Sequence, residues 1–200
     1  MNKEIKLPQP ELKGNISVEE ALAKRRSRRE YKDESLTLKE VGQLLWSAQG
    51  ITAEWGGRTA PSAGATYPLE IYLVVGKVKN LKSGLYHYLT PSHSLVKVID
   101  GDLRRQLAQA ALGQEMIEKA PITIVITAVF PRTTARYGER GVRYVQIEVG
   151  HSGENIYLQA ESLGLATVAV GAFQDKEIKE LLKLAREEPL YLMPVGKRIR

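Results

Sequence analysis

The hydrophobic and polar positions of this chain switch repeatedly between a helical and an extended period. Apolar residues recurring at intervals of three and four predict a short helix that starts at Ser17 and has residues 25–29 at its last turn, and further helices over 37–49, 102–112, 143–163 and 175–184. Continuous runs of β-forming apolar residues predict buried strands at 71–75, 122–129 and 166–170, and shorter runs predict a hairpin of 86–89 with 95–99 and a closing strand from 191. Because hairpins and helices mix around an apolar sheet, the predicted class is α+β.

The first predicted helix ends in an unusual basic segment. Ser17 and Glu20 form a capping box, an apolar stripe of Val18, Ala21 and Leu22 follows, and four arginines around Ser27 (residues 25–29) are expected at the last turn. One interpretation is a solvated helix end, where the helix dipole favours cations. The other is a phosphate site, because guanidinium groups bind phosphate oxygens bidentately.

Composition limits the classes of protein that fit. The 200 residues are 43% hydrophobic and 26% charged, which predicts one globular domain spanning residues 1–200. The net charge of +6 is a modest surplus that permits an anionic ligand. The absence of cysteine excludes disulfides and thiolate chemistry. The longest apolar run, 122–130, is too short to cross a bilayer and the start lacks an apolar signal region, so the prediction is a cytoplasmic protein without a membrane partner.

Most schemes that use only amino-acid side chains fail on this sequence. His87, His93 and His151 lack the spacing of a zinc site, so no metal is predicted. Ser62 does not lie in a nucleophile elbow, and Gly56-Gly57 lacks the Lys-Ser/Thr of a phosphate-binding loop. An enzyme with this inventory is expected to take its chemistry from a cofactor.

Seven motifs occur in one order along the chain. They are Arg25-Arg26-Ser27-Arg28-Arg29, Thr59-Ala60-Pro61-Ser62-Ala63-Gly64-Ala65-Thr66-Tyr67-Pro68-Leu69-Glu70, Gly84-Leu85-Tyr86-His87-Tyr88, Tyr137-Gly138-Glu139-Arg140-Gly141, Glu148-Val149-Gly150-His151, Gly171-Ala172-Phe173 and Pro194-Val195-Gly196. Together they resemble the nitroreductase superfamily, in particular its branch related to the dehydrogenases of azoline-forming peptide biosynthesis. The resemblance implies an α+β nitroreductase-like fold, with a central, mostly antiparallel sheet flanked by helices, in an intertwined homodimer with FMN at the subunit interface.

The resemblance also implies roles for particular residues. Arg25, Ser27 and Arg29 would meet the FMN phosphate and ribityl chain, with Arg26 and Arg28 turned elsewhere. The segment Pro61, Ser62, Ala63 and Gly64 would reach the flavin of the partner subunit, although Ala65 and Tyr67 replace an Asn and a Gln found outside this branch. The Gly171 backbone N–H, beside Ala172, would meet flavin N5. Lys197, Arg198 and Arg200 are candidates to complete the phosphate pocket.

The function that follows from the resemblance is an FMN-dependent oxidoreductase. It would pass hydride from NAD(P)H through N5 to an electron-poor acceptor such as a nitroaromatic or a quinone. The alternative is a flavin-dependent dehydrogenase of azoline or peptide substrates, but Arg136-Tyr137 stands where those enzymes carry a Lys-Tyr pair, and Arg is a poor base. A nucleic-acid-binding module is a more distant alternative, since the arginine cluster lacks interleaved aromatic residues. No residue is assigned as catalytic, and His151 is expected to be a helix-interface histidine.

Overall fold

The computed structural model describes residues 4–199 and is built on an eight-stranded sheet in which every ladder is antiparallel. The strands are β1 (Glu4–Lys6), β2 (Tyr31–Lys32), β3 (Leu69–Val75), β4 (Gly84–Leu89), β5 (Ser94–Asp100), β6 (Ile122–Ala128), β7 (Leu165–Thr167) and β8 (Glu188–Arg198). Their order across the sheet is β1-β5-β4-β3-β6-β8-β2, and β7 also pairs with β8. The predicted α+β class with an antiparallel sheet is therefore confirmed.

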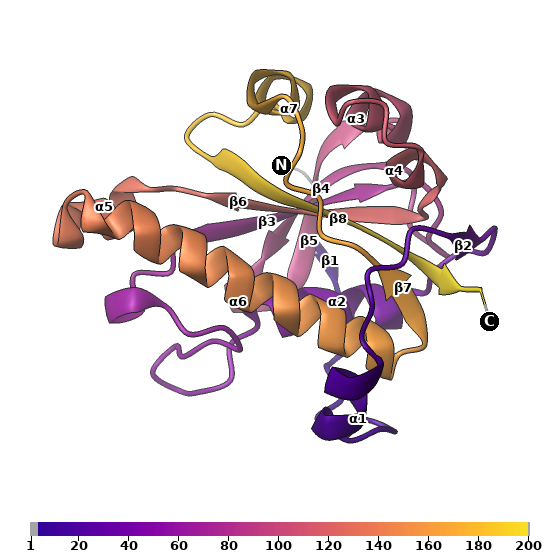
Figure 1. Ribbon diagram of the computed structural model, residues 1–200, viewed down its shortest axis with the longest axis horizontal. Coiled ribbons are helices and arrows are strands. Elements are labelled where there is room, and N and C mark those ends of the chain that lie inside the picture. Colours follow the sequence, from indigo (N-terminus) through magenta and orange to yellow (C-terminus); the bar gives the residue numbers. More distant parts are fainter. Residues whose placement is uncertain (1–3, 200) are drawn as a thin grey trace.

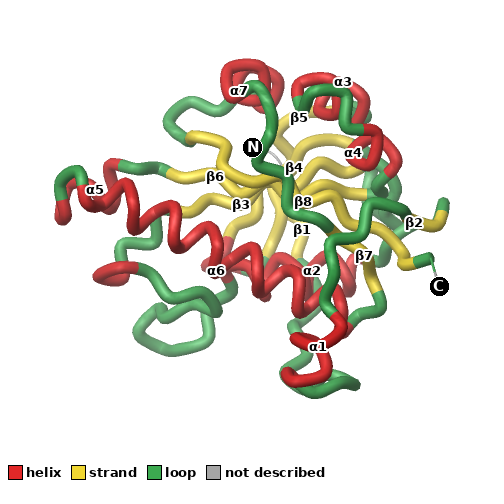
Figure 2. Tube along the Cα trace, viewed as in Figure 1, coloured by secondary structure: helices red, strands yellow, loops and turns green. Residues whose placement is uncertain are grey.

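Helices cover both faces of the sheet (Figures 1 and 2). They are α1 (Val18–Lys24), α2 (Leu38–Gln49), α3 (Arg104–Ala110), α4 (Glu115–Lys119), α5 (Pro131–Tyr137), α6 (Arg140–Ser162) and α7 (Asp175–Leu182). One apolar cluster joins α2 and α6 to one face of the sheet, and a second joins α3, α4 and α7 to the other. Successive side chains of a strand point to opposite faces, so Ile71 and Leu73 of β3 enter the first cluster and Tyr72 and Val74 the second.

The longer predicted elements match the observed ones, and the differences lie at short elements and ends. The helix expected at 102–112 is shorter, the short helices α4 and α5 were not expected, and the strand expected at 166–170 is the three-residue β7 followed by one bridge at Val170. Asp175 is the first residue of α7 rather than its cap, and β8 begins at Glu188 rather than 191. The edge strands β1 and β2 are too short to carry a period of two, so sequence periodicity did not indicate them.

The two predicted capping boxes differ in completeness. The Thr37 side chain accepts the Glu40 N–H while the Glu40 carboxylate accepts the Thr37 N–H, so α2 starts as expected. At α1, Ser17 accepts the Glu20 N–H. The apolar stripe of α1 is not buried as a whole, because Val18 is 65% and Leu22 54% exposed. Val18 and Leu22 face solvent, and Ala21 is the member of the stripe that is buried.

Candidate functional site

The tyrosine hydroxyl of Tyr157, on α6, links two segments that are far apart in the sequence. It lies 2.9 Å from Ser27 Oγ and accepts the Ala169 N–H at 2.7 Å. Ser27 belongs to the basic segment, and Ala169 lies two residues before Gly171. One side chain thus connects the segments that sequence analysis selected for the phosphate and for the flavin ring.

Arg25 lies against the same tyrosine. Its guanidinium is 5.0 Å from the centroid of the Tyr157 ring, and its Nε is 3.6 Å from Glu154 Oε1. The Arg28 N–H donates to Thr167 O at 2.9 Å, so the basic segment runs beside the end of β7. The expected position of the cluster at the last turn of α1 is wrong, because the helix ends at Lys24 and Arg25 is its extended C-cap.

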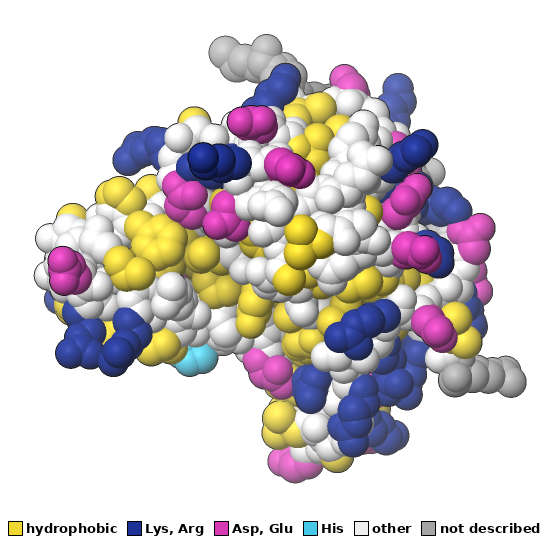
Figure 3. Space-filling view, turned by 45° about the horizontal axis from the view of Figure 1, so that its top comes forward, with side chains coloured by type: hydrophobic (Ala, Val, Ile, Leu, Met, Phe, Trp, Pro, Cys, Tyr) yellow, Lys and Arg dark blue, Asp and Glu magenta, His cyan; other side chains and the backbone are white. Residues whose placement is uncertain are grey.

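The side chains of the basic segment separate into two groups. Arg25 and Ser27 meet α6 at Tyr157, whereas Arg28 Nη2 lies 3.9 Å from Glu161 and Arg26 turns back to the Ala23 and Arg25 carbonyls. Arg29 is exposed. Figure 3 shows dark blue side chains gathered over this part of the surface. The alternation places one arginine and one hydroxyl beside Tyr157 and directs Arg26 and Arg28 elsewhere.

Glycines line the surface next to Tyr157. Gly171 is exposed and follows the bridge between Val170 and Leu192, and a Cβ added to it would lie 3.6 Å from the Tyr191 ring. A Cβ on Gly153 of α6 would lie 3.4 Å from the same ring. Gly153 is buried against Tyr191, whereas the exposed Gly171 has no side chain and lets a flat ligand approach its backbone closely. Ala172 is exposed beside Gly171 and accepts a hydrogen bond from Gln114 Nε2 at 2.9 Å through its carbonyl.

The basic residues at the end of β8 are already paired with carboxylates. Lys197 Nζ forms an ion pair with Glu40, the capping residue of α2. Arg198 Nη1 lies 2.6 Å from Glu161 Oε1, on the side of Arg28 rather than of Arg25. Arg200 lies outside the described residues. A phosphate role for Lys197 or Arg198 stays a prediction and requires these pairs to be shared or broken.

The predicted loop from Pro61 to Gly64 runs alongside α6 and α5. Asn155 of α6 donates to the Thr59 carbonyl at 3.2 Å, and Arg136 of α5 donates to the Gly64 carbonyl at 3.1 Å. Gly64 has a φ of 58°, and a Cβ there would lie 2.4 Å from the Tyr137 hydroxyl. Glycine adopts this conformation without strain, and any other residue would have to displace the ends of the Tyr137 and Arg136 side chains.

Two further residues of this loop adopt left-handed backbone although they carry side chains. Ala65 has a φ of 53° and Tyr67 a φ of 44°, and Tyr67 also precedes a proline, which favours extended backbone. Each such residue costs about 1–3 kcal/mol and persists only where the surroundings hold it, often at functional sites. The loop is a strained segment beside the candidate site.

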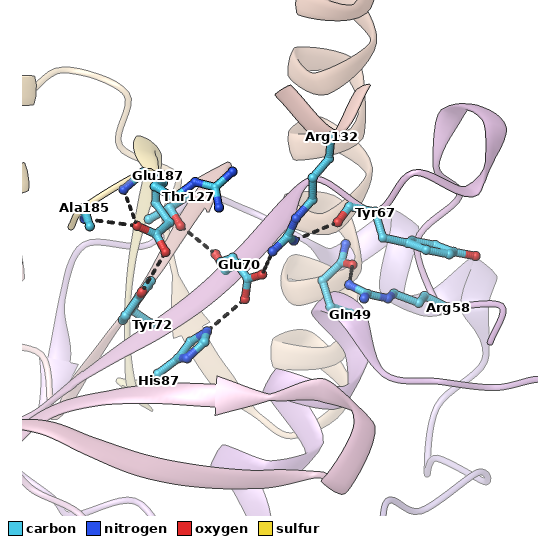
Figure 4. Close-up of polar contacts among 11 residues, drawn as sticks. Gln49, Arg58, Tyr67, Glu70, Tyr72, His87, Thr127, Arg132, Ala185 and Glu187 are labelled. Carbon is cyan, nitrogen blue, oxygen red and sulfur yellow. Dashed lines mark hydrogen bonds and ion pairs between the residues drawn. The ribbon is translucent and has the colours of Figure 1, made fainter. Parts of the chain in front are cut away.

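Figure 4 shows the polar groups that surround Tyr67. Its carbonyl accepts from Arg132 Nη1 at 3.2 Å, and the Arg58 guanidinium lies 4.4 Å from its ring centroid. Arg132 Nη2 is 2.6 Å from Glu70 Oε1, and the other Glu70 oxygen is 2.8 Å from His87 Nε2. Burial opposes ionisation of Glu70, but the His87 and Arg132 hydrogen bonds hold its pKa below the usual value. Glu70 is thus a carboxylate that anchors Arg132.

Glu148, on the buried face of α6, is in a less favourable environment. It is 2% exposed, and its Oε1 has no hydrogen-bond partner among residues 4–199. Burial raises the Glu148 pKa to about 7, against the smaller lowering effects of a hydrogen bond from Ser62 and of the Arg58 charge. Burial likewise lowers the pKa of Arg58, whose Nη1 donates to Gln49 Oε1 at 2.8 Å.

Several of these residues could not be predicted as site residues from the sequence. Tyr157 and Arg58 lie outside the seven motifs, and Glu148 lies in one of them without a predicted role. Arg136 is explained by its bond to Gly64. The expectation for His151 is wrong, because this histidine is exposed on α6. The one signal in the sequence was a glutamate beside Val149 on the apolar side of the predicted helix 143–163, since Glu is rarely buried without a partner.

The described residues contain no group of three or more His, Asp or Glu side chains that could hold a metal ion. Within residues 4–199, no helix has both the length and the apolar character to span a bilayer.

A cavity of about 370 Å³ lies between residues 11–18 and the helices α2 and α6, next to the Tyr157 region and lined by Trp46, Leu158 and amide side chains.

Comparison with known proteins identifies the class. The model of the nitroreductase family matches residues 22–197. The chain therefore belongs to the nitroreductase family, and it is an oxidoreductase of that family.

Particular relatives agree with this assignment. A protein of Methanocaldococcus jannaschii that carries the name nitroreductase is 52% identical over 196 residues, which cover 98% of this chain and 97% of the relative. A solved structure of a protein from Anabaena variabilis, also described as a nitroreductase, has a TM-score of 0.87 at 28% identity and covers 99% of this chain and 42% of that one. The Escherichia coli microcin synthetase McbBCD complex contains a chain with a TM-score of 0.74 at 25% identity, covering 93% of this chain and 74% of that one.

The pKa of Glu148 predicts how stability depends on pH. Below about pH 4.5 the carboxyl is protonated in both folded and unfolded chains; above it the unfolded chain releases the proton, while the folded chain retains it until about pH 7. The wild type should therefore lose roughly 3 kcal/mol of unfolding free energy relative to Glu148→Gln between pH 4.5 and 8. Urea unfolding across this range measures the difference.

Glu115→Gln, an exposed substitution on α4, is the control and should show no such fall. A constant difference between wild type and Glu148→Gln across the pH range would contradict the burial of an ionisable carboxyl at this position.

Proposed function

We propose that this chain is an FMN-dependent oxidoreductase that takes hydride from NAD(P)H and passes it to an electron-poor acceptor such as a nitroaromatic or a quinone. The observation that carries the proposal is the convergence of Arg25, Ser27 and the segment before Gly171 on Tyr157. Bound FMN would supply a ring that accepts and donates hydride at N5.

The residues present fit this cofactor in charge and in shape. Arg25 brings positive charge to one end of the site and Ser27 adds a hydroxyl, while Arg29 is exposed two residues further along the basic segment. The exposed Gly171 N–H makes no hydrogen bond to any of residues 4–199 and is free to donate to a ring atom. Gly150 is exposed and leaves room on α6, because an added Cβ would meet nothing within 4 Å there. The Tyr157 hydroxyl bonds both to Ser27 of the basic segment and to Ala169 of the segment before Gly171, so it fixes the position of one relative to the other.

A homodimer is part of the proposal. The loop from Pro61 to Gly64 would serve the cofactor of a partner subunit. Exposed apolar side chains support an interface with a second copy: Val18 and Leu22 on α1, Val142 and Ile147 on α6, and Leu12. Figure 3 shows hydrophobic side chains gathered in patches at the left and centre of one face of the molecule. Apolar exposure of this extent is typical of surfaces that bind partners.

A dehydrogenase of azoline or peptide substrates is the second candidate. Its support is the similarity to a chain of the microcin synthetase complex, which was solved with a truncated microcin precursor bound. Against it stands Arg136, which remains charged in proteins and here donates to the Gly64 carbonyl, so it is not placed to act as a base. We therefore favour the NAD(P)H-dependent activity.

The basic segment provides a residue-level test. Replacing Arg25 or Arg29 with Ala removes a charge-assisted contact to the phosphate dianion and should weaken FMN binding by about 1.5–3 kcal/mol, which is tenfold to more than a hundredfold in Kd. Arg26→Ala and Arg28→Ala should matter much less. Titration of the apoprotein with FMN, followed by the flavin absorbance bands, measures each affinity.

Riboflavin, which has no phosphate, is the matched ligand control. It should bind the wild type weakly and respond little to the same substitutions. Equal losses at all four arginines, or equal losses for FMN and riboflavin, would show that the cluster acts through diffuse charge or fold stability.

The two enzyme candidates differ in the electron donor. Under anaerobic conditions, NADH or NADPH should bleach the flavin absorbance of the holoprotein without any acceptor, and steady-state rates should follow a ping-pong pattern because one open site serves both substrates in turn. Stopped-flow absorbance provides the measurement. A holoprotein that NADH and NADPH leave oxidised, but that an azoline-containing peptide reduces, would establish the second candidate instead.

Assembly provides a separate test. A site that needs the partner's loop requires a C2 dimer, and an obligate interface of this kind buries over roughly 2,000 Å². Light scattering of the holoprotein should give the mass of two chains, and dilution to monomer should release FMN. A monomer that remains fully loaded with FMN would refute the shared site.

A further inference from the structure

The basic segment has a second side, which does not face Tyr157. The chain leaves α1 in an extended conformation at Arg25, so successive side chains point to opposite sides. Arg25 and Ser27 meet Tyr157, whereas Arg26 and Arg28 line a surface hollow of about 450 Å³. The last turns of α6 lie beside α1 (Figure 1) and complete this hollow together with the end of β8. The proposed FMN contacts leave this side of the segment unused.

Positive charge prevails in the hollow. Four cations and two carboxylates line it, which leaves a net charge of +2. They are Lys24, Arg26, Arg28, Arg198, Glu20 and Glu161. Lys24 is paired with Glu20 at 2.5 Å along α1, so the excess charge belongs to the three arginines around Glu161. Such a concave, positively charged surface attracts anions.

Glu161 holds two of these arginines in place. Its side chain is 5% exposed and lies 2.6 Å from Arg198 Nη1 and 3.9 Å from Arg28 Nη2. A guanidinium has more N–H donors than one such ion pair uses. The buried Nε of Arg28 has no acceptor among residues 4–199, and Arg26 donates to the Ala23 and Arg25 carbonyls through Nη1 alone in the same part of the chain. The arginines therefore keep donors for a further acceptor.

A network that only fastened α1 to α6 would need less charge. Arg198 by itself neutralises Glu161 at short distance, and Arg28 then brings a second positive charge to the same carboxylate. Like charges that are held close together repel, and arginine cannot relieve the repulsion by losing its proton. The cost is removed when an anion binds between them.

We propose that Arg26, Arg28 and Arg198 form a second anion site, which binds the terminal phosphate of a small phosphorylated ligand and is separate from the proposed FMN site. Planar guanidinium groups bind phosphate oxygens through paired N–H donors. The dianion of a phosphate monoester matches the net charge of +2, and Glu161 is the positioning residue for two of the arginines. Free phosphate and the 2′-phosphate of NADPH both present this chemistry.

Isothermal titration calorimetry of the protein saturated with FMN tests the site with inorganic phosphate, NADP⁺ and NAD⁺. FMN then occupies the Arg25 side of the segment. If the source is the 2′-phosphate, NADP⁺ should bind about tenfold or more tightly than NAD⁺, which lacks that group, and phosphate should compete with it. If the source is free phosphate, phosphate should bind saturably while the two nucleotides bind alike. Absence of saturable binding for both phosphate and NADP⁺ would overturn the proposal.

Arg26→Ala is the central variant, because Arg26 bonds to carbonyls of its own segment and its loss leaves the ion pairs of Glu161 intact. This variant and Arg28→Ala should each weaken phosphate binding by about tenfold or more, with little change in FMN affinity. Arg105→Ala removes the same charge from an exposed position on α3 and should match the wild type. Equal phosphate affinity in wild type and Arg26→Ala, or an equal loss in Arg105→Ala, would show diffuse surface charge and overturn the site.

This result is distinguishable from the outcome for the proposed function. If the wild type binds no FMN, the proposed function fails, while the same titrations of the flavin-free protein still judge the hollow. In that case Arg26→Ala is compared in an Arg25→Ala background, and the double variant should bind phosphate about tenfold or more weakly than Arg25→Ala alone. Loss of phosphate binding in Arg25→Ala alone would place the anion beside Tyr157 and overturn the second site.

Discussion

The strand β6 is buried on both faces, and the rest of the structure depends on covering it. All seven of its residues are buried, between β3 on one side and β8 on the other. A strand in this position needs a layer of helices over each face, because apolar side chains leave the strand in both directions. The long helix α6 with α2 covers one face, and α3, α4 and α7 cover the other. The position of α6 fixes where the candidate site forms.

Along α6, one surface meets the core and others meet the segments of the site. Val145, Val149 and Ile156 pack into the core. Tyr157 forms hydrogen bonds with Ser27 and Ala169, and Glu154 forms an ion pair with Arg25. The rigid helix therefore positions residues from the basic segment and from the glycine-bearing segment before α7. This arrangement gives a nitroreductase-family oxidoreductase a surface with positive charge at one end and exposed backbone donors at the other.

The strained loop shows a different balance of forces. Its left-handed residues and the buried Glu148 both cost free energy, and well-packed alternatives exist for each. The cost is offset locally by hydrogen bonds and by the stacking of Arg58 on Tyr67. Such a loop is held in one conformation, as the proposed role of presenting small residues to the cofactor of a partner subunit requires.

Hydrophobic periodicity by itself determined the long elements and the α+β class, because burial of an apolar face leaves a period of 3.6 or 2 in the sequence. Motif order along the chain indicated the family, and the comparison with the family model confirmed it. Only the tertiary structure decided that the basic segment lies beyond α1, that Tyr157 joins Ser27 to Ala169, and that Lys197 and Arg198 face Glu40 and Glu161. These contacts join residues separated by 12 to 157 positions in the chain. No local pattern records such pairs, since they form only when the packing of α6 on the sheet brings distant segments together.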